Sequence, residues 1–485
     1  MKRNVFLVLV LLGYHHATGQ KIIFSQKDQV CELPAAMAML SGGLASHPYQ
    51  DLDKNPKIFA VENWRNSQQS FTWTVHISGQ GNYKFAMLME IKRSLKVASH
   101  HEVTFVLSSS RGSVKLQRES EGWDKLFFAS TLALDTGIQQ LHLTAEFPDT
   151  SAAISLYSLE LARVPVWEQE HLKAESLRGE PLWLNEAKYG LFIHWNARSQ
   201  PRRGSAKSYE QAVDDFNVNA FAAMVKSTGA DFIVFTTSWA LQTFPGPLAA
   251  LDSLLPGNTT QRDLIADLAD ALEVYGIHLI IYCNFRIDRL GWRKETMLSS
   301  VKSTGYFNSL ISIYKEIGER YGGKIAGVWI DDGMTLYPYN APFEKMTAVL
   351  KQKNKNIVVG YNSWIYPGFT DFQDFYGGEL GITPNAATPK YLTIGGDGYF
   401  TAGPQKGLRA TFCGLLEPGD WTHTQPNEDI PDPLLSVDDL THIVRMAIER
   451  KNLPIMNVQI YQDGSISPKT QLLLKQLNKN VKKEK

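Results

Sequence analysis

The sequence has few cysteines, no excess of charge of either sign and no long hydrophobic run. Its three cysteines, Cys31, Cys283 and Cys413, are scattered and form no C-x-x-C pair. They therefore provide neither a disulfide framework nor a zinc site. The 49 basic and 49 acidic residues balance to a formal net charge of +0. This balance argues against a nucleic-acid partner, because phosphate binding needs a basic surplus on one face.

The most apolar stretch lies at the start of the chain and is too short to span a bilayer as a helix. Lys2 and Arg3 precede the apolar run Val5–Leu12, and Ala17-Thr-Gly19 offers small residues before Gln20. This order is typical of an export signal. We therefore predict a signal peptide at residues 1–19, a secreted or periplasmic mature protein, and no membrane span.

Residues 20–165 have a hydrophobic pattern of period two, with glycine and serine at short intervals. Alternation of this kind predicts short strands with one wet and one buried face. The clearest alternating runs are Phe71–Ile77, Val103–Leu107, Val114–Leu116 and Ile154–Leu159. We predict an antiparallel β-sandwich domain here, which is either a carbohydrate-binding module or a structural cap.

From residue 166 to 485 short apolar runs alternate with amphipathic stretches, which is the pattern of repeated βα units. The runs predicted as strands are Leu191–Trp195, Phe232–Thr236, Leu279–Tyr282, Ile325–Ile330, Ile357–Tyr361, Leu408–Phe412 and Ile455–Val458, with a less regular one near Tyr376–Leu380. No glycine-rich phosphate fingerprint follows any of them, which disfavours a dinucleotide-binding sheet. The predicted fold is α/β: a (β/α)8-type barrel preceded by the sandwich.

Helical periodicity fills the gaps between these runs. Residues 263–275 place Leu264, Leu268 and Leu272 on one face, and residues 308–321 repeat the pattern. Pro342 and Pro468 stand where helices would begin, the latter after Ser467 as N-cap.

Polar and aromatic residues stand at the downstream ends of the predicted strands, where a barrel of this kind carries its reactive groups. They are His194 and Trp195, Trp239, Tyr282 and Asn284, Asp331 and Asp332, Asn362 and Trp364, and Glu379. Two carboxyl groups that flank one bond are what glycoside hydrolysis requires. Tryptophan rings in addition offer apolar faces to sugar C–H groups. The set predicts a site for an oligosaccharide or polysaccharide substrate.

The barrel region also resembles the α-L-fucosidases of glycoside hydrolase family 29. The similar segments occur in the family's order: Lys188-Tyr-Gly-Leu-Phe-Ile-His-Trp195, Asp215-Phe216 with Asn219-Ala-Phe221, Gly229-Ala-Asp-Phe-Ile-Val-Phe-Thr-Thr237, Arg262-Asp-Leu-Ile265, Gly327-Val-Trp-Ile-Asp331, Asp374-Phe-Tyr-Gly-Gly-Glu379 and Met456-Asn-Val458 with Asp463-Gly464. The resemblance covers residues 183–477 and leaves out the predicted sandwich.

The resemblance implies an exo-acting, retaining glycosidase of α-L-fucosidase type that works without a cofactor. It implies Asp331 as the nucleophile and Glu379 as the general acid/base. Apart from the resemblance, Glu417 and Asp397 are rivals for the second role. His194 would contact a sugar hydroxyl and Tyr282 would line the pocket. Trp195, Trp239 and Trp364 are the other predicted substrate-binding residues.

The sequence departs from the family at three places. The family has T-T-K-H-H-D-G-F where this chain has Thr236-Thr-Ser-Trp-Ala-Leu-Gln-Thr-Phe244, and N-D-R where it has Asn362-Ser-Trp364. For the family's E-W-Y contact, Glu210 is the nearest candidate. Because a site built to bind particular hydroxyls depends on each partner, the departures leave two alternatives open. One is a retaining glycosidase for another α-linked sugar such as L-galactose, and the other is a catalytically inactive glycan-binding barrel.

Asp331-Asp332-Gly333 also has a simpler interpretation as a turn or a helix N-cap, since aspartate and glycine favour both. A metal site is not predicted. Neighbouring residues on a strand point to opposite faces, and no histidine or cysteine cluster completes a ligand set.

Overall fold

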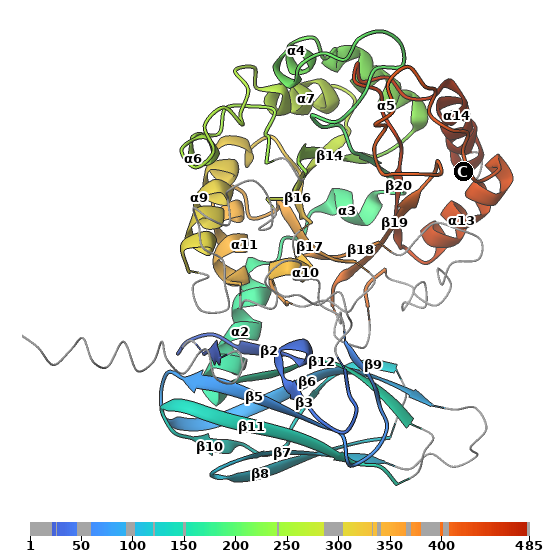
Figure 1. Ribbon diagram of the computed structural model, residues 1–485. Helices are drawn as coiled ribbons and strands as arrows, with labels where there is room; N and C mark the ends of the chain where they lie inside the picture. Colours follow the sequence, from blue (N-terminus) through green and yellow to red (C-terminus); the bar gives the residue numbers. More distant parts are fainter. Residues whose placement is uncertain are drawn as a thin grey trace, which may run out of the picture. The chain divides into compact units, whose positions relative to one another are not determined.

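The computed structural model (Figure 1) divides into two compact units, one ending at Leu172 and one beginning at Lys173. It describes residues 22–25, 27–45, 60–93, 102–119, 122–148, 152–239, 242–285, 304–331, 333–336, 341–364, 370–379, 398–400 and 407–482. The predicted signal peptide at residues 1–19 lies outside the described residues. The division into domains at residues 165 and 166 stays a prediction.

The N-terminal unit contains two six-stranded sheets. One has the order β1-β5-β11-β7-β8, with β3 paired to β5, and the other has the order β10-β6-β12-β2, with β4 on β12 and β9 on β6. The first contains β1 (Ile22–Phe24), β3 (Met39–Leu40), β5 (Ser70–Ile77), β7 (Val103–Ser109), β8 (Gly112–Arg118) and β11 (Gly137–Glu146). The second contains β2 (Cys31–Pro34), β4 (Val61–Trp64), β6 (Gly81–Arg93), β9 (Gly122–Phe127), β10 (Leu132–Leu134) and β12 (Ala152–Arg163). All pairs are antiparallel except β1 with β5.

A single apolar core joins the two sheets of this unit, as the period-two pattern predicts. Along β7 the buried residues are Val103, Phe105 and Leu107, and the residues between them are partly exposed. Two buried tryptophans satisfy their indole N–H groups through the backbone. Trp64 donates to the Gln69 carbonyl at 3.2 Å and Trp73 to the Pro34 carbonyl at 2.9 Å. The predicted antiparallel sandwich is confirmed.

The second unit is a closed barrel of eight parallel strands in chain order, because β13 pairs with both β14 and β20. The strands are β13 (Gly190–Ile193), β14 (Phe232–Ser238), β15 (His278–Cys283), β16 (Gly327–Ile330), β17 (Val358–Trp364), β18 (Phe375–Gly378), β19 (Arg409–Leu415) and β20 (Leu453–Asn457). Each of the eight predicted runs overlaps one of these strands. The predicted (β/α)8 barrel is therefore confirmed.

The interior of the barrel is packed with aromatic rings, so the barrel is a solid core and not a channel. Phe192, Phe232, Trp329 and Phe375 belong to one cluster of buried residues. Gly190 makes room for this packing, because a Cβ atom at that position would lie 2.2 Å from the Phe232 ring. The filled interior leaves the strand ends as the place where a ligand can enter.

Helices surround the barrel in Figure 1. The longer ones are α5 (Val218–Thr228), α7 (Leu264–Glu273), α9 (Thr304–Tyr321), α11 (Phe343–Lys351), α13 (Val437–Glu449) and α14 (Pro468–Lys482). The helices predicted at residues 263–275 and 308–321 are present as α7 and α9. In α7, Asp263 is the N-cap and accepts a hydrogen bond from the Ala266 N–H at 3.1 Å. Pro342 and Pro468 stand at the starts of α11 and α14.

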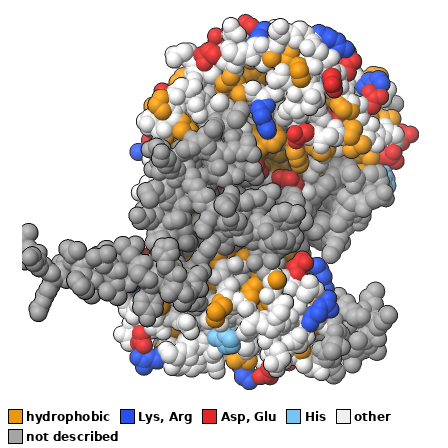
Figure 2. Space-filling model, viewed as in Figure 1, with side chains coloured by type: hydrophobic (Ala, Val, Ile, Leu, Met, Phe, Trp, Pro, Cys, Tyr) orange, Lys and Arg blue, Asp and Glu red, His pale blue; other side chains and the backbone are white. Residues whose placement is uncertain are grey.

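Basic and acidic side chains are interspersed on the visible faces of both units in Figure 2, in keeping with the net charge of +0. Within the part of the chain that the structure describes, none of the helices combines the length and apolar character needed to cross a bilayer.

Candidate active site

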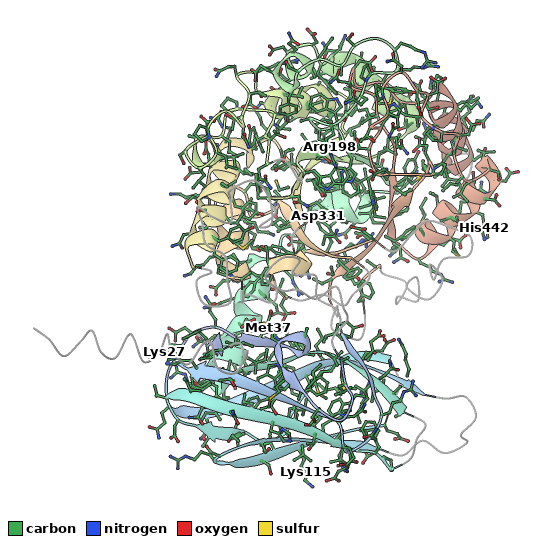
Figure 3. The ribbon with its side chains drawn as sticks, in the orientation of Figure 1. Lys27, Met37, Lys115, Arg198, Asp331 and His442 are labelled. Carbon is green, nitrogen blue, oxygen red and sulfur yellow. The ribbon has the colours of Figure 1, made fainter. Side chains whose placement is uncertain are left out.

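Side chains from seven consecutive barrel strands, or from the loops that follow them, meet in one pocket at the carboxyl ends of the strands. The pocket has an empty volume of about 270 Å³ and is lined by Phe192, His194, Trp239, Tyr282, Asp331, Asn362, Glu379 and Trp421. In Figure 3 the Asp331 label lies over the middle of the barrel unit. Sequence reasoning expected five of these residues: His194, Trp239, Tyr282, Asp331 and Glu379. The structure brings all five together.

Asp331 follows β16 and is held by donors from the neighbouring strands. The Tyr282 hydroxyl donates to its Oδ2 at 2.5 Å, and the Asn284 amide donates to the same oxygen at 2.7 Å. The Asn362 amide donates to Oδ1. The backbone N–H of Asp331 donates to the Cys283 carbonyl at 2.9 Å, which continues the hydrogen-bond ladder between β15 and β16. Three donors from neighbouring strands fix the position of this carboxylate.

Glu379 follows β18 and shares a donor with Asp331. The Nδ2 atom of Asn362 donates to Glu379 Oε1 at 2.6 Å and also to Asp331 Oδ1. Two hydrogen bonds of about 3 Å or less hold the nearest oxygens of the two carboxylates within about 6 Å of each other. The shared donor therefore keeps the two acids next to each other in one pocket.

His194 lies in the pocket wall as a neutral imidazole. Burial lowers its pKa to about 3, with a smaller contribution from the positive charge of Arg198. Its Nδ1 atom is 2.8 Å from the Thr236 hydroxyl, and its ring stacks on Phe192 with centroids 4.4 Å apart. A neutral imidazole fixed in this way can accept or donate a hydrogen bond to a sugar hydroxyl, but it carries no charge at neutral pH.

Aromatic rings form most of the remaining wall. The His194 ring centroid is 4.8 Å from Trp239 and 5.5 Å from Trp421. The loop that carries Trp421 is tied to the strand ends, because the Asn457 amide donates to the Trp421 carbonyl at 3.1 Å and the Thr422 hydroxyl to the His194 carbonyl at 2.6 Å. The wall therefore offers apolar faces that suit sugar C–H groups.

Cys413 is a thiol that feels the charges of these acids and is not a nucleophile. It is buried in the barrel core. Burial, together with the negative charges of Glu379 and Asp331, raises the pKa of the Cys413 thiol well above its usual range. The reactive form of cysteine is the thiolate, so this side chain is an inert part of the barrel core.

The prediction that Trp195 contacts substrate is wrong in its geometry. Trp195 is 1% exposed, its indole N–H donates to the Gln462 carbonyl at 2.9 Å, and its ring packs edge-on against Phe216. Successive residues of a strand point to opposite sides. Because His194 points into the pocket, Trp195 must point outward, toward the helices.

Other predicted residues lie elsewhere. Glu417 is fully buried and accepts hydrogen bonds from the Thr470 hydroxyl at 2.6 Å and the Gln459 N–H at 3.2 Å, outside the pocket lining. Glu210 lies in α4 (Tyr209–Asp214) and accepts from the Gln261 N–H at 2.9 Å. Three predictions fall outside the described residues: the Trp364 side chain, Asp332 and Asp397.

Sequence reasoning missed three residues of the pocket or its rim and gave two others no role. Asn284 and Asn362 were noted as strand-end polar groups, and their spacing carried no sign that both would bind Asp331. Phe192, Trp421 and Arg198 were missed. For Trp421 a usable signal exists, since it is an aromatic residue in the loop after a barrel strand. Among the described residues no group of three or more His, Cys, Asp or Glu side chains is arranged to hold a metal ion.

The comparison with known families decides the assignment. A family model described as alpha-L-fucosidase matches residues 206–485, which is more than half of the chain. The chain belongs to the α-L-fucosidase family. This family of glycoside hydrolases acts on glycans, and the matched region includes both candidate carboxylates, Asp331 and Glu379. No curated protein matches this fucosidase-family chain.

Solved structures similar to this family member include three fucosidases. The Thermotoga maritima α-fucosidase with a mechanism-based inhibitor is 19% identical, with 63% of this chain and 75% of that one covered and a TM-score of 0.44. The α-L-fucosidase AlfC with Fuca(1,6)GlcNAc is 16% identical, with 61% and 96% covered and a TM-score of 0.43. A bacterial fucosidase with a monovalent iminocyclitol inhibitor is 16% identical, with 62% and 74% covered and a TM-score of 0.44. The family assignment depends on the sequence match alone.

Proposed function

We propose that this chain is an exo-acting, retaining α-L-fucoside hydrolase in which Asp331 is the nucleophile and Glu379 the general acid/base. The observation that carries the proposal is the Asn362 amide, which donates to both carboxylates within one pocket. In retaining enzymes the two carboxyl groups are about 5–5.5 Å apart, and in inverting enzymes about 6.5–9.5 Å apart. A shared donor favours the shorter separation.

The proposed reaction has two steps. Asp331 attacks the anomeric carbon while the Glu379 carboxylic acid gives its proton to the leaving oxygen, so one glycosidic bond breaks and a glycosyl–aspartate bond forms. Water then attacks the same carbon, Glu379 takes its proton, and the Asp331 carboxylate leaves. Donation from Tyr282, Asn284 and Asn362 supports Asp331 in its ionised role. The donor that Glu379 shares with Asp331 supports a role for Glu379 at the same bond.

The shape and wall of the site support an exo-acting enzyme. A pocket that ends on the barrel core, lined by Phe192, Trp239 and Trp421, favours one terminal sugar over an extended chain. His194 is suited to bind one hydroxyl of that sugar. The changed loop after β14 keeps L-galactose as the second candidate sugar. It differs from L-fucose only in carrying a hydroxymethyl group in place of the C5 methyl group.

The first test replaces the proposed nucleophile. We expect Asp331→Asn to lower kcat for an aryl α-L-fucoside by about 10⁴-fold or more, because removing one member of a concerted catalytic group removes nearly all its effect. Glu417→Gln is the matched control, since it removes a buried acid outside the pocket and should keep activity. The α-anomer as first product in proton NMR would support retention. A β-anomer would contradict it.

A panel of aryl glycosides distinguishes the alternatives. Release from the α-L-fucoside supports the leading proposal, and release only from the α-L-galactoside transfers the same mechanism to that sugar. If no member of the panel is cleaved and the unaltered chain and Asp331→Asn bind fucosylated oligosaccharides equally well, the barrel is a glycan-binding protein without catalysis.

A further inference from the structure

Arg198 lies beside the pocket in the loop after β13. Its guanidinium carbon is 4.6 Å from the centre of the Trp239 ring, and Trp239 lines the pocket. The side chain is partly buried, and its Nε atom is buried with no hydrogen-bond partner. Figure 3 labels Arg198 and Asp331 close together over the middle of the barrel unit. A buried guanidinium donor without a partner is costly, and a ligand that supplied an acceptor would remove this cost.

Two other arginines of the same loop have an acidic partner, which Arg198 lacks in the described part of the chain. Arg202 donates from Nε to Asp429 at 2.8 Å, and Arg203 lies 3.1 Å from the same carboxylate. Arg202 also stands over an aromatic ring, that of Tyr461, at 5.9 Å. Within the described part of the chain Arg198 has the ring contact and no acidic partner. Its positive charge is therefore available to a ligand.

The acids of the pocket do not supply that partner. Asp331 already receives hydrogen bonds from Tyr282, Asn284 and Asn362. The field of Arg198 nevertheless extends to the pocket, because it contributes to the lowered pKa of His194. Such a cation attracts an anion to the pocket rim and not to the floor, where the two carboxylates repel it.

We propose that Arg198, held against Trp239, binds an anionic substituent of the glycan at the rim of the pocket. The substituent is a sulfate ester or a uronate carboxylate. The guanidinium group presents a planar fork of donors that matches two oxygens of either group, and stacking on an indole ring limits its motion. The inference rests on the proposed function in taking a glycan as substrate, and it narrows that substrate to a charged one.

The test measures binding in the Asp331→Asn background, so that it does not depend on turnover. The first probe pair is a sulfated fucose oligosaccharide and the same sample after chemical desulfation. The second pair carries terminal α-L-fucose on galacturonate or on galactose. We expect the charged member of one pair to bind about ten-fold or more tightly, the usual effect of a charged hydrogen bond. The pair that shows the difference identifies the anion.

Substitutions assign the preference to Arg198. Arg198→Met should remove it, and Arg198→Lys should keep only part of it, because lysine retains the charge without the fork. Arg202→Met is the matched control on the same loop and should leave the preference unchanged. Equal binding of charged and neutral probes would overturn the inference, as would a preference that survives Arg198→Met or an equal loss for both members of a pair. Hydrolysis of a neutral aryl α-L-fucoside tests the proposed function separately.

Discussion

At the scale of single residues, Asn362 gives the site its most specific feature. Its amide nitrogen has two hydrogens, and each points to a different carboxylate, Asp331 Oδ1 and Glu379 Oε1. A neutral donor between two acids keeps them close without adding a charge of its own. The arrangement brings two carboxyl groups to one place in the pocket, which a double displacement requires.

Tyr282 offers a residue-scale test of how Asp331 is held. Its hydroxyl donates to Asp331 Oδ2 at 2.5 Å, and a hydrogen bond to a charged group contributes about 1.5–3 kcal/mol. We expect Tyr282→Phe to lower kcat/KM for an aryl α-L-fucoside by about 10–100-fold and to change the melting temperature little. Steady-state kinetics and thermal unfolding of the same preparation measure both effects.

The control for this variant is Tyr189→Phe, because Tyr189 is equally buried and donates to a backbone carbonyl, that of Thr228, at 2.7 Å. It should lose about 1 kcal/mol of stability and keep its activity at temperatures where it is folded. Unchanged activity in Tyr282→Phe would show that this hydroxyl does not support the nucleophile.

The residues of the site could be predicted from the sequence only as far as strand ends could be recognised. His194, Asp331 and Glu379 interrupt or follow apolar runs, and a parallel barrel brings such positions to one end. Their side of the strand depends on register, which is why Trp195 was expected in the pocket and lies outside it. The double role of Asn362 depends on the distances between three strands in the folded barrel. These distances cannot be read from the spacing of residues along the sequence.

At the scale of secondary-structure elements, Glu417 ties together segments that are far apart in the chain. It follows β19, and it accepts hydrogen bonds from the Gln459 N–H beyond β20 and from the Thr470 hydroxyl in the first turn of α14. Burial raises the pKa of the Glu417 carboxyl to about 7. Because of Glu417, the stability of the contacts between β19, β20 and α14 depends on pH.

The sign of the effect follows from the direction of the shift. Between the unfolded pKa of about 4.5 and the folded value of about 7, the folded chain binds more protons at Glu417 than the unfolded chain. Stability is therefore highest below this window and falls as pH rises through it, by up to about 3 kcal/mol. Glutamine cannot ionise, so Glu417→Gln should gain about 1–3 kcal/mol relative to the unaltered protein between pH 5 and pH 8.

Urea unfolding at pH 5 and pH 8 measures this difference for the unaltered protein and for Glu417→Gln. A constant difference between the two proteins at both pH values would show that Glu417 titrates alike in the folded and unfolded chain. Activity serves as a second readout, and it should be the same in both proteins wherever they are folded.

The elements themselves were largely predictable because their signals are local. β14 is buried along its whole length and begins with the continuous apolar run Phe232–Phe235, as expected for a parallel strand covered on both faces. α7 was visible in the helical spacing of Leu264, Leu268 and Leu272. α5 was not predicted, although Asn217 caps it and Gly229 ends it in a left-handed conformation. The apolar face of α5 is short, and the periodicity of its hydrophobic residues alone does not distinguish this segment from a loop.

At the scale of the whole molecule, the two units have separate hydrophobic cores, one in the sandwich and one in the barrel. The sandwich contains a buried acidic pair, because Glu32 on β2 lies directly across from Glu160 on β12. Lys125 forms an ion pair with Glu160 at 2.6 Å. Burial, and then the charge of Glu160, raise the pKa of Glu32 well above its usual range, and Lys125 opposes the rise.

The pH dependence that Glu32 gives to the sandwich allows calorimetry to assign an unfolding transition to that unit. Because each unit has its own core, we expect two unfolding transitions. The raised pKa of Glu32 means that the folded sandwich binds the extra proton above the unfolded pKa, so its transition should move to lower temperature as pH rises from 5 to 8. Glu32→Gln should reduce that movement and raise the sandwich transition by a few degrees at pH 8, since about 1 kcal/mol corresponds to about 4 °C in a domain of this size.

The barrel supplies the internal control. Glu32→Gln should leave one transition unmoved, and Glu417→Gln should move that transition and not the other. If both substitutions displace the same transition, or if the unaltered chain unfolds in one two-state step, the units unfold together and the separate cores do not act as independent cooperative units. In that case the buried acids of the sandwich contribute to the stability of the barrel, and the pH dependence measured for Glu417 would have to include the contribution of Glu32.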